Sequence, residues 1–431
     1  MYYRGRSLSA QRHMKELLIY LYGLERRGIK VGLDHTKRLL EKVGNPHMRY
    51  PTIHISGTNG KGSTCAMIAS IFREANLKTG LYTSPHLLRF NERIRVNGIP
   101  ISDKDIIRFV NRYRNSFDGI PVTFFEATTA LAFWYFEKSS VDVAVIETGL
   151  GGRLDSTNVL SPELTVITPV ALDHRYLLGK NLRKISREKG GIIKHKVPVV
   201  IAPQNREVTH VLQEISGKNN SPCYFVKPPV TLKTNWKKII TQFRLNDVTY
   251  TTPFLGNHQA VNSATAIQSV LTYDGTVSPT IIQKGMDKTI WPGRLQKLDK
   301  THPIFYDVAH NAHGLKAVLE TFDSLFSQKP IGIFSLKEDK ELELIVDEIR
   351  GKFSELITVS TENANLYSSS ELSNKLKKYG ILSHAAENIH NAWIKLQYRK
   401  DFSVPILIFG SHYIAGDVFD LFDFSFDSGI I

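Results

Sequence analysis

A glycine-rich stretch after a β-branched run holds the residues whose spacing most clearly suggests chemistry. Residues 55–64 read "ISGTNGKGST", and an apolar pattern at helical spacing follows them. Glycines let an anion approach the backbone, and a helix N-terminus offers free N–H groups and positive dipole charge. Lys61 can reach phosphate oxygens, and Ser63 or Thr64 can meet a phosphate or its Mg²⁺. The usual spelling G-x-x-x-x-G-K-[ST] is broken by Gly62. We predict a phosphate-binding loop, with an ordinary glycine-rich turn as the alternative.

Three further polar residues follow apolar runs that we expect to be strands. Glu147 ends the run "VDVAVIE", Ser84 follows residues 79–83, and His174 follows residues 164–168. Ligands of open parallel sheets gather beyond the carboxyl ends of the strands, so these groups are expected on one rim. A hydroxyl, a carboxylate and an imidazole could surround Mg²⁺, although Mg²⁺ prefers oxygen. A structural ion pair for Glu147 and a structural histidine are the alternatives.

Basic and polar residues later in the chain repeat this placement. Lys189 lies in "SREKGGIIK" and, taken alone, is expected at the surface. Arg294 in "WPGRLQ" offers a fork of donors to phosphate oxygens. The stretch "YDVAHNAHG" puts Asp307 and His310 where a strand becomes a helix. We therefore expect Arg294, Asp307 and His310 to face the same region from a second domain.

The alternation of strand-like and helix-like runs predicts an α/β fold with mainly parallel sheets. The expected organisation is a P-loop-type sheet domain with flanking helices over residues 1–293 and a smaller Rossmann-like domain over 294–431. The boundary is placed near Trp291–Lys300, where the alternation restarts behind a Pro-Gly pair. Strands are expected at 79–83, 141–147, 164–168, 197–202 and 303–309, helices near 103–117 and 126–138, and antiparallel strands within 230–254.

Bulk composition limits the classes of function. The chain has 431 residues, of which 42% are hydrophobic, and two cysteines, too few for a disulfide framework or a cysteine metal site. No apolar run of about 18 residues occurs, so we expect no membrane partner. We also expect the protein to be cytoplasmic and a monomer. The formal charge of +14 favours anionic partners. The basic residues are spread along the chain, so we expect no nucleic-acid partner.

Eight motifs together resemble one known family. In order they are "HISGTNGKGSTC", "SPHL", "ETGLGGRLDSTN", "LDH", "REKGGIIK", "HQAVNSATA", "PGRLQ" and "DVAHNAHG". From about Leu17 to Phe419 the chain resembles folylpolyglutamate synthases and bacterial dihydrofolate synthases, which belong to the Mur ligase superfamily. The resemblance implies an ATP-dependent ligase that phosphorylates a carboxylate of dihydropteroate or of a reduced folate. L-Glutamate would then attack the acyl phosphate. It also implies that G-T-N-G-K-G-S is this superfamily's own phosphate loop.

The resemblance implies roles for individual residues. Lys61, Lys189 and His310 would be catalytic, and Lys189 would be carbamylated to serve a second Mg²⁺. Whether a monovalent cation also takes part stays open. The implied ATP contacts are Thr58, Asn59, Gly60, Lys61, Gly62, Ser63, Asn262, Arg294 and Asp307, and the implied Mg²⁺ ligands are Ser84, Glu147 and His174.

The implied pterin-binding residues are Thr123, Phe125, Asp155 and Ser156, with the aromatic ring available for stacking. Lys30 stands where an acidic residue is expected for this role. Dihydropteroate only, reduced folates only, or both are therefore possible substrates, and we predict both. A nucleic-acid ATPase would need a conventional phosphate loop. A cell-wall Mur ligase would need an additional N-terminal domain, whereas about fifty residues precede the loop.

Overall fold

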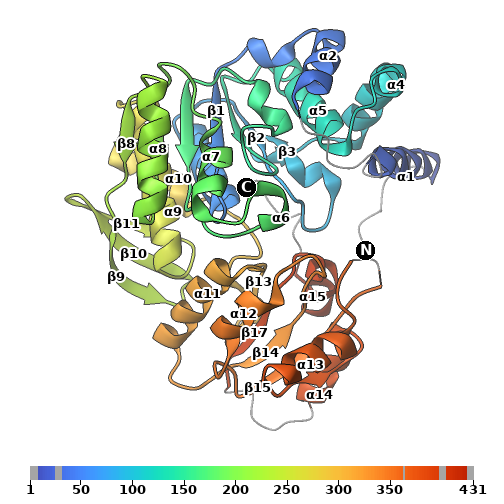
Figure 1. Cartoon of the computed structure of the whole chain (residues 1–431), viewed down its shortest axis with the longest axis vertical. Helices are drawn as coiled ribbons and strands as arrows, with labels where there is room; N and C mark the ends of the chain where they lie inside the picture. Colours follow the sequence, from blue (N-terminus) through green and yellow to red (C-terminus); the bar gives the residue numbers. More distant parts are fainter. Residues whose placement is uncertain (1–7, 25–31, 363–364, 398–403, 425–431) are drawn as a thin grey trace.

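A mainly parallel β-sheet organises the first part of the chain (Figure 1). The computed structural model describes residues 8–24, 32–362, 365–397 and 404–424, and within them eight strands form this sheet in the order β4-β3-β2-β5-β1-β6-β7-β8. β2 with β3 and β3 with β4 pair antiparallel, and the other pairs are parallel. The strands are β1 (Thr52–Ser56), β2 (Thr79–Tyr82), β3 (Ile94–Val96), β4 (Ile99–Pro100), β5 (Val143–Glu147), β6 (Leu164–Ile167), β7 (Val199–Ile201) and β8 (Cys223–Phe225).

Helices cover both faces of this sheet because successive side chains of a strand point to opposite faces. Ile53, Ile55 and Val145 pack on one side with α3, α9 and α10, and Ala144 and Ile146 pack on the other with α1, α2, α4 and α5. The short α6 and the pair α7 and α8 lie toward β6 and β7. The helices are α1 (Leu8–Gly23), α2 (Asp34–Val43), α3 (Lys61–Glu74), α4 (Asp103–Gly119), α5 (Phe124–Lys138), α6 (Arg175–Leu178), α7 (Leu182–Gly190), α8 (Arg206–Lys218), α9 (Asn257–Tyr273) and α10 (Pro279–Asp287); short 3₁₀ turns lie at Pro46–Met48, Phe90–Arg93 and Ser156–Val159.

A small antiparallel sheet lies in the chain between β8 and α9 and packs against α9 and α10. Its strands are β9 (Val230–Asn235), β10 (Ile240–Leu245) and β11 (Val248–Thr252). Trp236, in the β9–β10 turn, lies with its ring centroid 5.4 Å from Phe326 and 6.4 Å from Phe305. Both phenylalanines belong to the hydrophobic core of the second sheet and its helices, so the turn makes an apolar contact with the second unit.

The second sheet has the strand order β12-β13-β17-β14-β15-β16 within the described residues, and β12 alone is antiparallel to its neighbour. Phe305 and Leu407 face α11, α12 and α13, whereas Ile304 and Ile408 face α14 and α15. The elements are β12 (Gln296–Lys297), β13 (Ile304–Asp307), α11 (Ala312–Leu325), β14 (Ile331–Phe334), α12 (Leu342–Ile349), β15 (Glu355–Thr358), α13 (Ser369–Lys378), β16 (His384–Ala385), α14 (Ile389–Gln397), β17 (Ile406–Phe409) and α15 (Ala415–Leu421).

This arrangement confirms the predicted fold class and the predicted strands and helices, with small shifts at their ends. The helix expected to begin at Glu126 begins at Phe124, because Thr123 and Glu126 form a capping box that starts it earlier. The division between residues 293 and 294 stays a prediction. Lys30, which stands where an acidic pterin-binding residue was expected, lies outside the described residues. Among the described helices, none combines the length and apolar character that crossing a bilayer requires.

Candidate active site

A cavity of about 590 Å³ opens where the carboxyl ends of the first sheet face the second unit. Residues from β13, α9 and α11 complete its wall. Most of the predicted chemical positions line it: Thr58, Asn59, Gly60, Lys61, Gly62, Ser63, Ser84, Glu147, Asn262, Arg294, Asp307 and His310. The expectation that strand-end groups converge on one cleft is therefore met for these residues.

The phosphate loop depends on glycines with positive φ. Gly57 has φ +154°, and a Cβ there would lie 1.9 Å from the Thr168 hydroxyl oxygen. Gly60 has φ +82°, and a Cβ there would lie 2.1 Å from Oδ1 of Asn262. Other residues would be strained in this conformation and would clash. The glycines thus let the loop turn tightly from β1 into α3 against its neighbours.

The N-terminus of α3 carries polar groups that the protein itself leaves unsatisfied. Among the described residues, the buried hydroxyls of Ser63 and Thr64 have no hydrogen-bond partner. Lys61 Nζ lies 3.8 Å from Glu147 Oε1 and 3.4 Å from the carbonyl oxygen of Thr58. Buried polar groups normally have partners, so this helix end is suited to an anion and its counter-ion.

Glu147 is a buried carboxylate at the edge of the cavity. Burial raises its pKa, and the nearby charge of Lys61 acts in the opposite direction. The backbone N–H of Ser84 donates to Glu147 Oε2 at 3.1 Å. The carboxylate and the Ser84 hydroxyl are hard oxygen donors, so they fit Mg²⁺. Within the described residues, no three His, Cys, Asp or Glu side chains gather closely enough to hold a metal ion. Mg²⁺ commonly binds through one or two carboxylates together with waters and substrate phosphates.

The second unit contributes Arg294 and Asp307 to the same cavity. Asp307 accepts hydrogen bonds from the backbone N–H groups of Leu295 at 2.8 Å and Ala309 at 2.7 Å. Burial raises the pKa of Asp307, and the positive charge of Arg294 opposes this shift. Asp307 therefore holds two backbone segments in place, the one that carries Arg294 and the one that follows β13.

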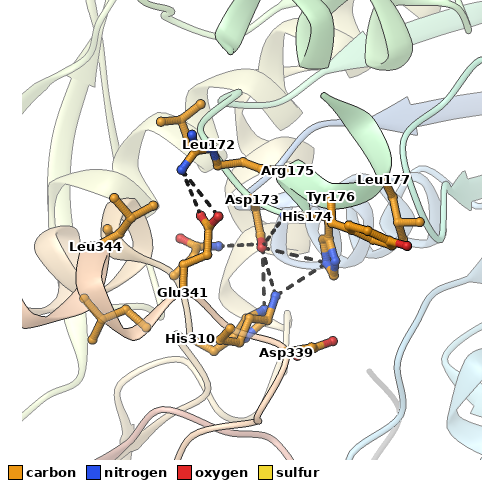
Figure 2. A pocket seen from close by; sticks show the side chains of 14 residues that line it. Leu172, Asp173, His174, Arg175, Tyr176, Leu177, His310, Asp339, Glu341 and Leu344 are labelled. Carbon is orange, nitrogen blue, oxygen red and sulfur yellow. Dashed lines mark hydrogen bonds and ion pairs between the residues drawn. The ribbon is translucent and has the colours of Figure 1, made fainter. Parts of the chain in front are cut away.

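His174 does not line this cavity; it lines a second crevice of about 220 Å³ (Figure 2). Asp173 and His310 line the crevice as well, and His310 also lines the larger cavity. Burial lowers the pKa values of both histidines to about 4, so both imidazoles are neutral at pH 7. In its neutral form, His310 can donate from Nδ1 to the carbonyl oxygen of Val308 at 2.9 Å, which leaves Nε2 as an acceptor. The expected grouping of Ser84, Glu147 and His174 thus extends over two separate spaces.

Lys189 is buried, so the surface placement expected from its sequence context alone is wrong. It lies at the C-terminal end of α7, and its Nζ donates to the carbonyl oxygen of Gly57 at 2.7 Å. Burial, together with the nearby charge of Lys61, lowers its pKa to about 7. A lysine with this pKa is a nucleophilic amine near neutral pH.

Three of the predicted pterin-binding side chains make hydrogen bonds within the protein. Thr123 caps α5 by accepting from the N–H of Glu126, and the Ser156 hydroxyl lies 2.7 Å from that of Thr129. The buried carboxylate of Asp155 accepts from backbone N–H groups of residues 150 and 157 at 2.8 and 3.0 Å. The contacts of Asp155 and Ser156 organise the loop after β5, and that of Thr123 begins α5. None of the three residues lines the described cavities.

Phe125 differs from these three because its side chain is open to a ligand. It is 40% exposed, and a Cβ on Gly149 would lie 3.0 Å from its ring. The guanidinium of Arg93 lies 5.8 Å from the ring centroid. The ring therefore lies beside the glycine-rich loop that follows Glu147, and its exposed part can meet a ligand.

Sequence reasoning missed His258 and Lys340. His258 lies near the start of α9 and lines the large cavity, and its buried Nδ1 has no partner among the described residues. In the sequence, its position two residues after Gly256 in "GNHQ", at the start of an apolar helical pattern, could have indicated it. Lys340 lines the smaller crevice and lies in the charged run "KEDKELE", which gives no sign of burial.

Comparisons with known proteins show the family of the chain. The family model of the Mur ligase middle domain matches residues 55–270, and that of the Mur ligase, glutamate ligase domain, matches residues 293–412. The chain belongs to the Mur ligase family. Dihydrofolate synthase/folylpolyglutamate synthase of Bacillus subtilis is 33% identical over 93% of this chain and 96% of its own length. Folylpolyglutamate synthase of Lacticaseibacillus casei is 36% identical over 80% of this chain and 84% of its own length.

Solved structures of relatives have the same fold as this Mur ligase. Mycobacterium tuberculosis folylpolyglutamate synthase complexed with ADP and AMPPCP superposes with a TM-score of 0.86 at 28% identity, covering 95% of this chain and 99% of the other. Escherichia coli FolC in complex with DHPP and ADP superposes with a TM-score of 0.85 at 25% identity, covering 94% of this chain and 97% of the other. The phosphate loop and Glu147 lie in the matched middle domain, whereas Arg294 and His310 lie in the matched glutamate ligase domain. The large cavity is therefore enclosed by both.

Proposed function

We propose that this Mur ligase is a bifunctional dihydrofolate synthase and folylpolyglutamate synthase. It would use ATP to join L-glutamate to dihydropteroate and to the γ-carboxyl of a reduced folate. The observation that carries the proposal is the single cavity in which the phosphate loop faces Arg294 of the second unit. A monofunctional folylpolyglutamate synthase is the second candidate, because a similar relative has that name alone.

The residues of the cavity would act mainly by positioning and by neutralising charge. Backbone N–H groups at residues 60–63 and Lys61 would hold the phosphates, with Asn262 on one side and Arg294 and Asp307 on the other. The γ-phosphoryl group would pass to the carboxylate of the pterin substrate, and ADP would leave. The α-amine of glutamate would then attack the acyl carbon, and phosphate would leave from the tetrahedral intermediate. His310 lies between the two crevices and is suited to contact the reacting phosphate.

Glu147 and Ser84 would hold Mg²⁺, which would neutralise phosphate charge during transfer. The buried carboxylate supports this role because a nearby cation would offset the rise in its pKa. We do not assign His174 to this ion, because it lines the other crevice. Phe125 would stack on the pterin ring, whereas Thr123, Asp155 and Ser156 would shape the loop beside it. We also propose that the two domains meet between residues 293 and 294.

Lys189 would react with CO₂ to form a carbamate, with loss of one proton from the amine. The product keeps one N–H, so it can still donate to the carbonyl oxygen of Gly57, and it gains a carboxylate suited to a second Mg²⁺. The lowered pKa supports this chemistry because only the neutral amine attacks CO₂.

ADP release tests the proposed function. Purified protein would be given ATP, Mg²⁺ and L-glutamate with dihydropteroate in one reaction and tetrahydrofolate in another. Release in both reactions, dependent on both glutamate and the pterin substrate, is expected. Release with tetrahydrofolate alone would reduce the function to polyglutamylation. Release with neither would refute the proposal.

A further inference from the structure

A polar network joins the phosphate loop to the second domain. Asn59 Nδ2 donates to Asn311 Oδ1 at 3.2 Å, and Asn311 Nδ2 donates to Asn59 Oδ1 at 3.0 Å. Asn311 also caps α11, because its Oδ1 accepts from the N–H of Gly314 at 2.8 Å. The amide of Asn59 is therefore paired with the other domain, although its backbone belongs to the phosphate loop.

Asp173 extends this network to a lysine of the second domain. Its Oδ2 accepts from Asn311 Nδ2 at 3.0 Å, and its Oδ1 accepts from Lys340 Nζ at 2.9 Å. The side chains of Lys340 and Asp173 are only 9% and 11% exposed. Figure 2 shows Asp173 between His174 and His310, with interactions drawn to both sides. Asp173 comes from the loop after β6 and Lys340 from the segment before α12, so the ion pair forms between domains.

Distances identify Lys340 as the main partner of Asp173. The Nζ atom of Lys340 lies 2.9 Å from the carboxylate, whereas the Nε2 atoms of His174 and His310 each lie 3.9 Å from it. Removing one member of a buried pair leaves an uncompensated charge, whereas a separated pair regains water. Such a contact favours one docked geometry and can still open.

We propose that Asp173, Asn311 and Lys340 are positioning residues that dock the second domain on the phosphate loop. The inference rests on the proposed ligase function. Docking brings His310 and Arg294 to the cavity that holds the phosphate loop, so the site is complete only when the network is made. Asn59 would link the docked state to the loop that binds phosphates. None of the three positioning residues needs to touch a reacting atom.

The test compares Lys340→Met with Lys352→Met. Lys352 pairs with Asp323 at 2.7 Å within the second domain, so its variant removes an exposed ion pair away from the interface. Lys340→Met is expected to lower kcat at least about tenfold, because domain positioning is impaired. Its KM for ATP should rise as well, because Arg294 and Asp307 no longer reach the phosphates. Its melting temperature should stay close to that of the control, because Asp173 regains water when the domains separate. Lys340→Arg should recover part of kcat.

A double variant and a scattering measurement separate docking from a structural role. Asp173→Asn with Lys340→Met should lower kcat no further than the worse single variant, because the two residues act as a pair. With ADP and Mg²⁺, small-angle X-ray scattering should show a more expanded particle for Lys340→Met than for wild type or Lys352→Met.

Two results would overturn the inference. One is a Lys340→Met protein with the kcat and scattering of the control. The other is a Lys340→Met protein whose kcat and melting temperature fall together while its scattering stays unchanged, with no recovery of kcat in Lys340→Arg. If wild type released no ADP with either pterin substrate, the proposed function would fail. The scattering comparison would then still decide whether Lys340 docks the domain.

Discussion

Carbamylation of Lys189 gives the most specific prediction. It depends on the fraction of the amine that is unprotonated, and burial raises this fraction by lowering the pKa. An amine with a pKa of about 7 is roughly half neutral at pH 7, whereas an ordinary lysine with a pKa near 10.5 is neutral in about one molecule in three thousand. Burial therefore raises the reactive fraction by about three orders of magnitude. Lys189 should bind CO₂ at neutral pH where exposed lysines do not.

The assay is ADP release in CO₂-depleted buffer and at a fixed dissolved CO₂ concentration, from pH 6 to 9. Depletion should lower wild-type activity, and CO₂ should restore it, with a weaker response as pH falls below about 7 and the amine becomes protonated. Carbon-13 NMR with labelled bicarbonate should show a carbamate signal in wild type and none in Lys189→Ala. Lys194→Ala is the matched control, because burial also lowers the pKa of Lys194 while its Nζ contacts the carbonyl oxygen of Asn158 instead.

The Lys189→Ala variant should lose turnover while keeping its fold, and acetate should restore some activity by supplying a carboxylate. Wild-type rates in this variant would remove Lys189 from the mechanism. A wild-type rate insensitive to CO₂, with no labelled carbamate, would refute carbamylation even if the lysine were needed.

The same pKa predicts a pH-dependent stability. A buried cation destabilises the folded state, and for Lys189 this cost is full below pH 7 and disappears as pH rises from 7 to about 10.5, where the unfolded lysine also loses its proton. In CO₂-free buffer, Lys189→Met should therefore be more stable than wild type at pH 6, by roughly a few kcal/mol less the lost hydrogen bond to Gly57. The advantage should shrink toward pH 10 in thermal melts. A constant difference across this range would contradict the pKa argument.

Three further predictions address the cavity and its neighbourhood. Glu147→Gln should lower kcat on the order of 100-fold or more and remove the Mg²⁺ dependence of ATP binding in calorimetry; an unchanged Mg²⁺ dependence would place the ion elsewhere. Gly60→Ala should raise the KM for ATP about tenfold, since left-handed strain of about 1–2 kcal/mol adds to the clash with Asn262, and a wild-type KM would show that the loop adapts. Phe125→Ala should raise the KM for the pterin substrate up to about tenfold with little change for ATP, and Phe125→Tyr should behave as wild type; equal effects on both substrates would argue against stacking.

Local patterns in the sequence were sufficient to predict the fold class and the edge of the first sheet where the large cavity lies. A β-branched run followed by glycines and an apolar helix predicted β1, the loop and α3, because strand burial and helix-end chemistry act over a few residues. Glu147 and Asp307 were found for a similar reason. Each ends a buried strand, and the carboxyl ends of neighbouring parallel strands must lie at one edge.

Contacts between distant segments could not be predicted in this way. Lys189 follows Arg187 and Glu188, and nothing local shows that its amine reaches the carbonyl of Gly57 far along the chain. His174 was expected on the rim beside Glu147, yet its backbone is left-handed, with φ 48°, and it lines the other crevice. Lys340 lies among charged neighbours, and its burial depends on how the second domain docks.

The unsatisfied groups around the phosphate loop explain why ligand binding and catalysis use the same residues. The hydroxyls of Ser63 and Thr64 are buried without described partners, and the carboxylate of Glu147 has a pKa raised by burial. Each of these features destabilises the free protein, and each would be relieved by a phosphate or a cation. A ligand that binds only the folded state stabilises it by an amount that grows with the logarithm of its concentration divided by its Kd. Nucleotide with Mg²⁺ should therefore raise the melting temperature more than nucleotide alone, because only the pair satisfies both the helix end and the carboxylate.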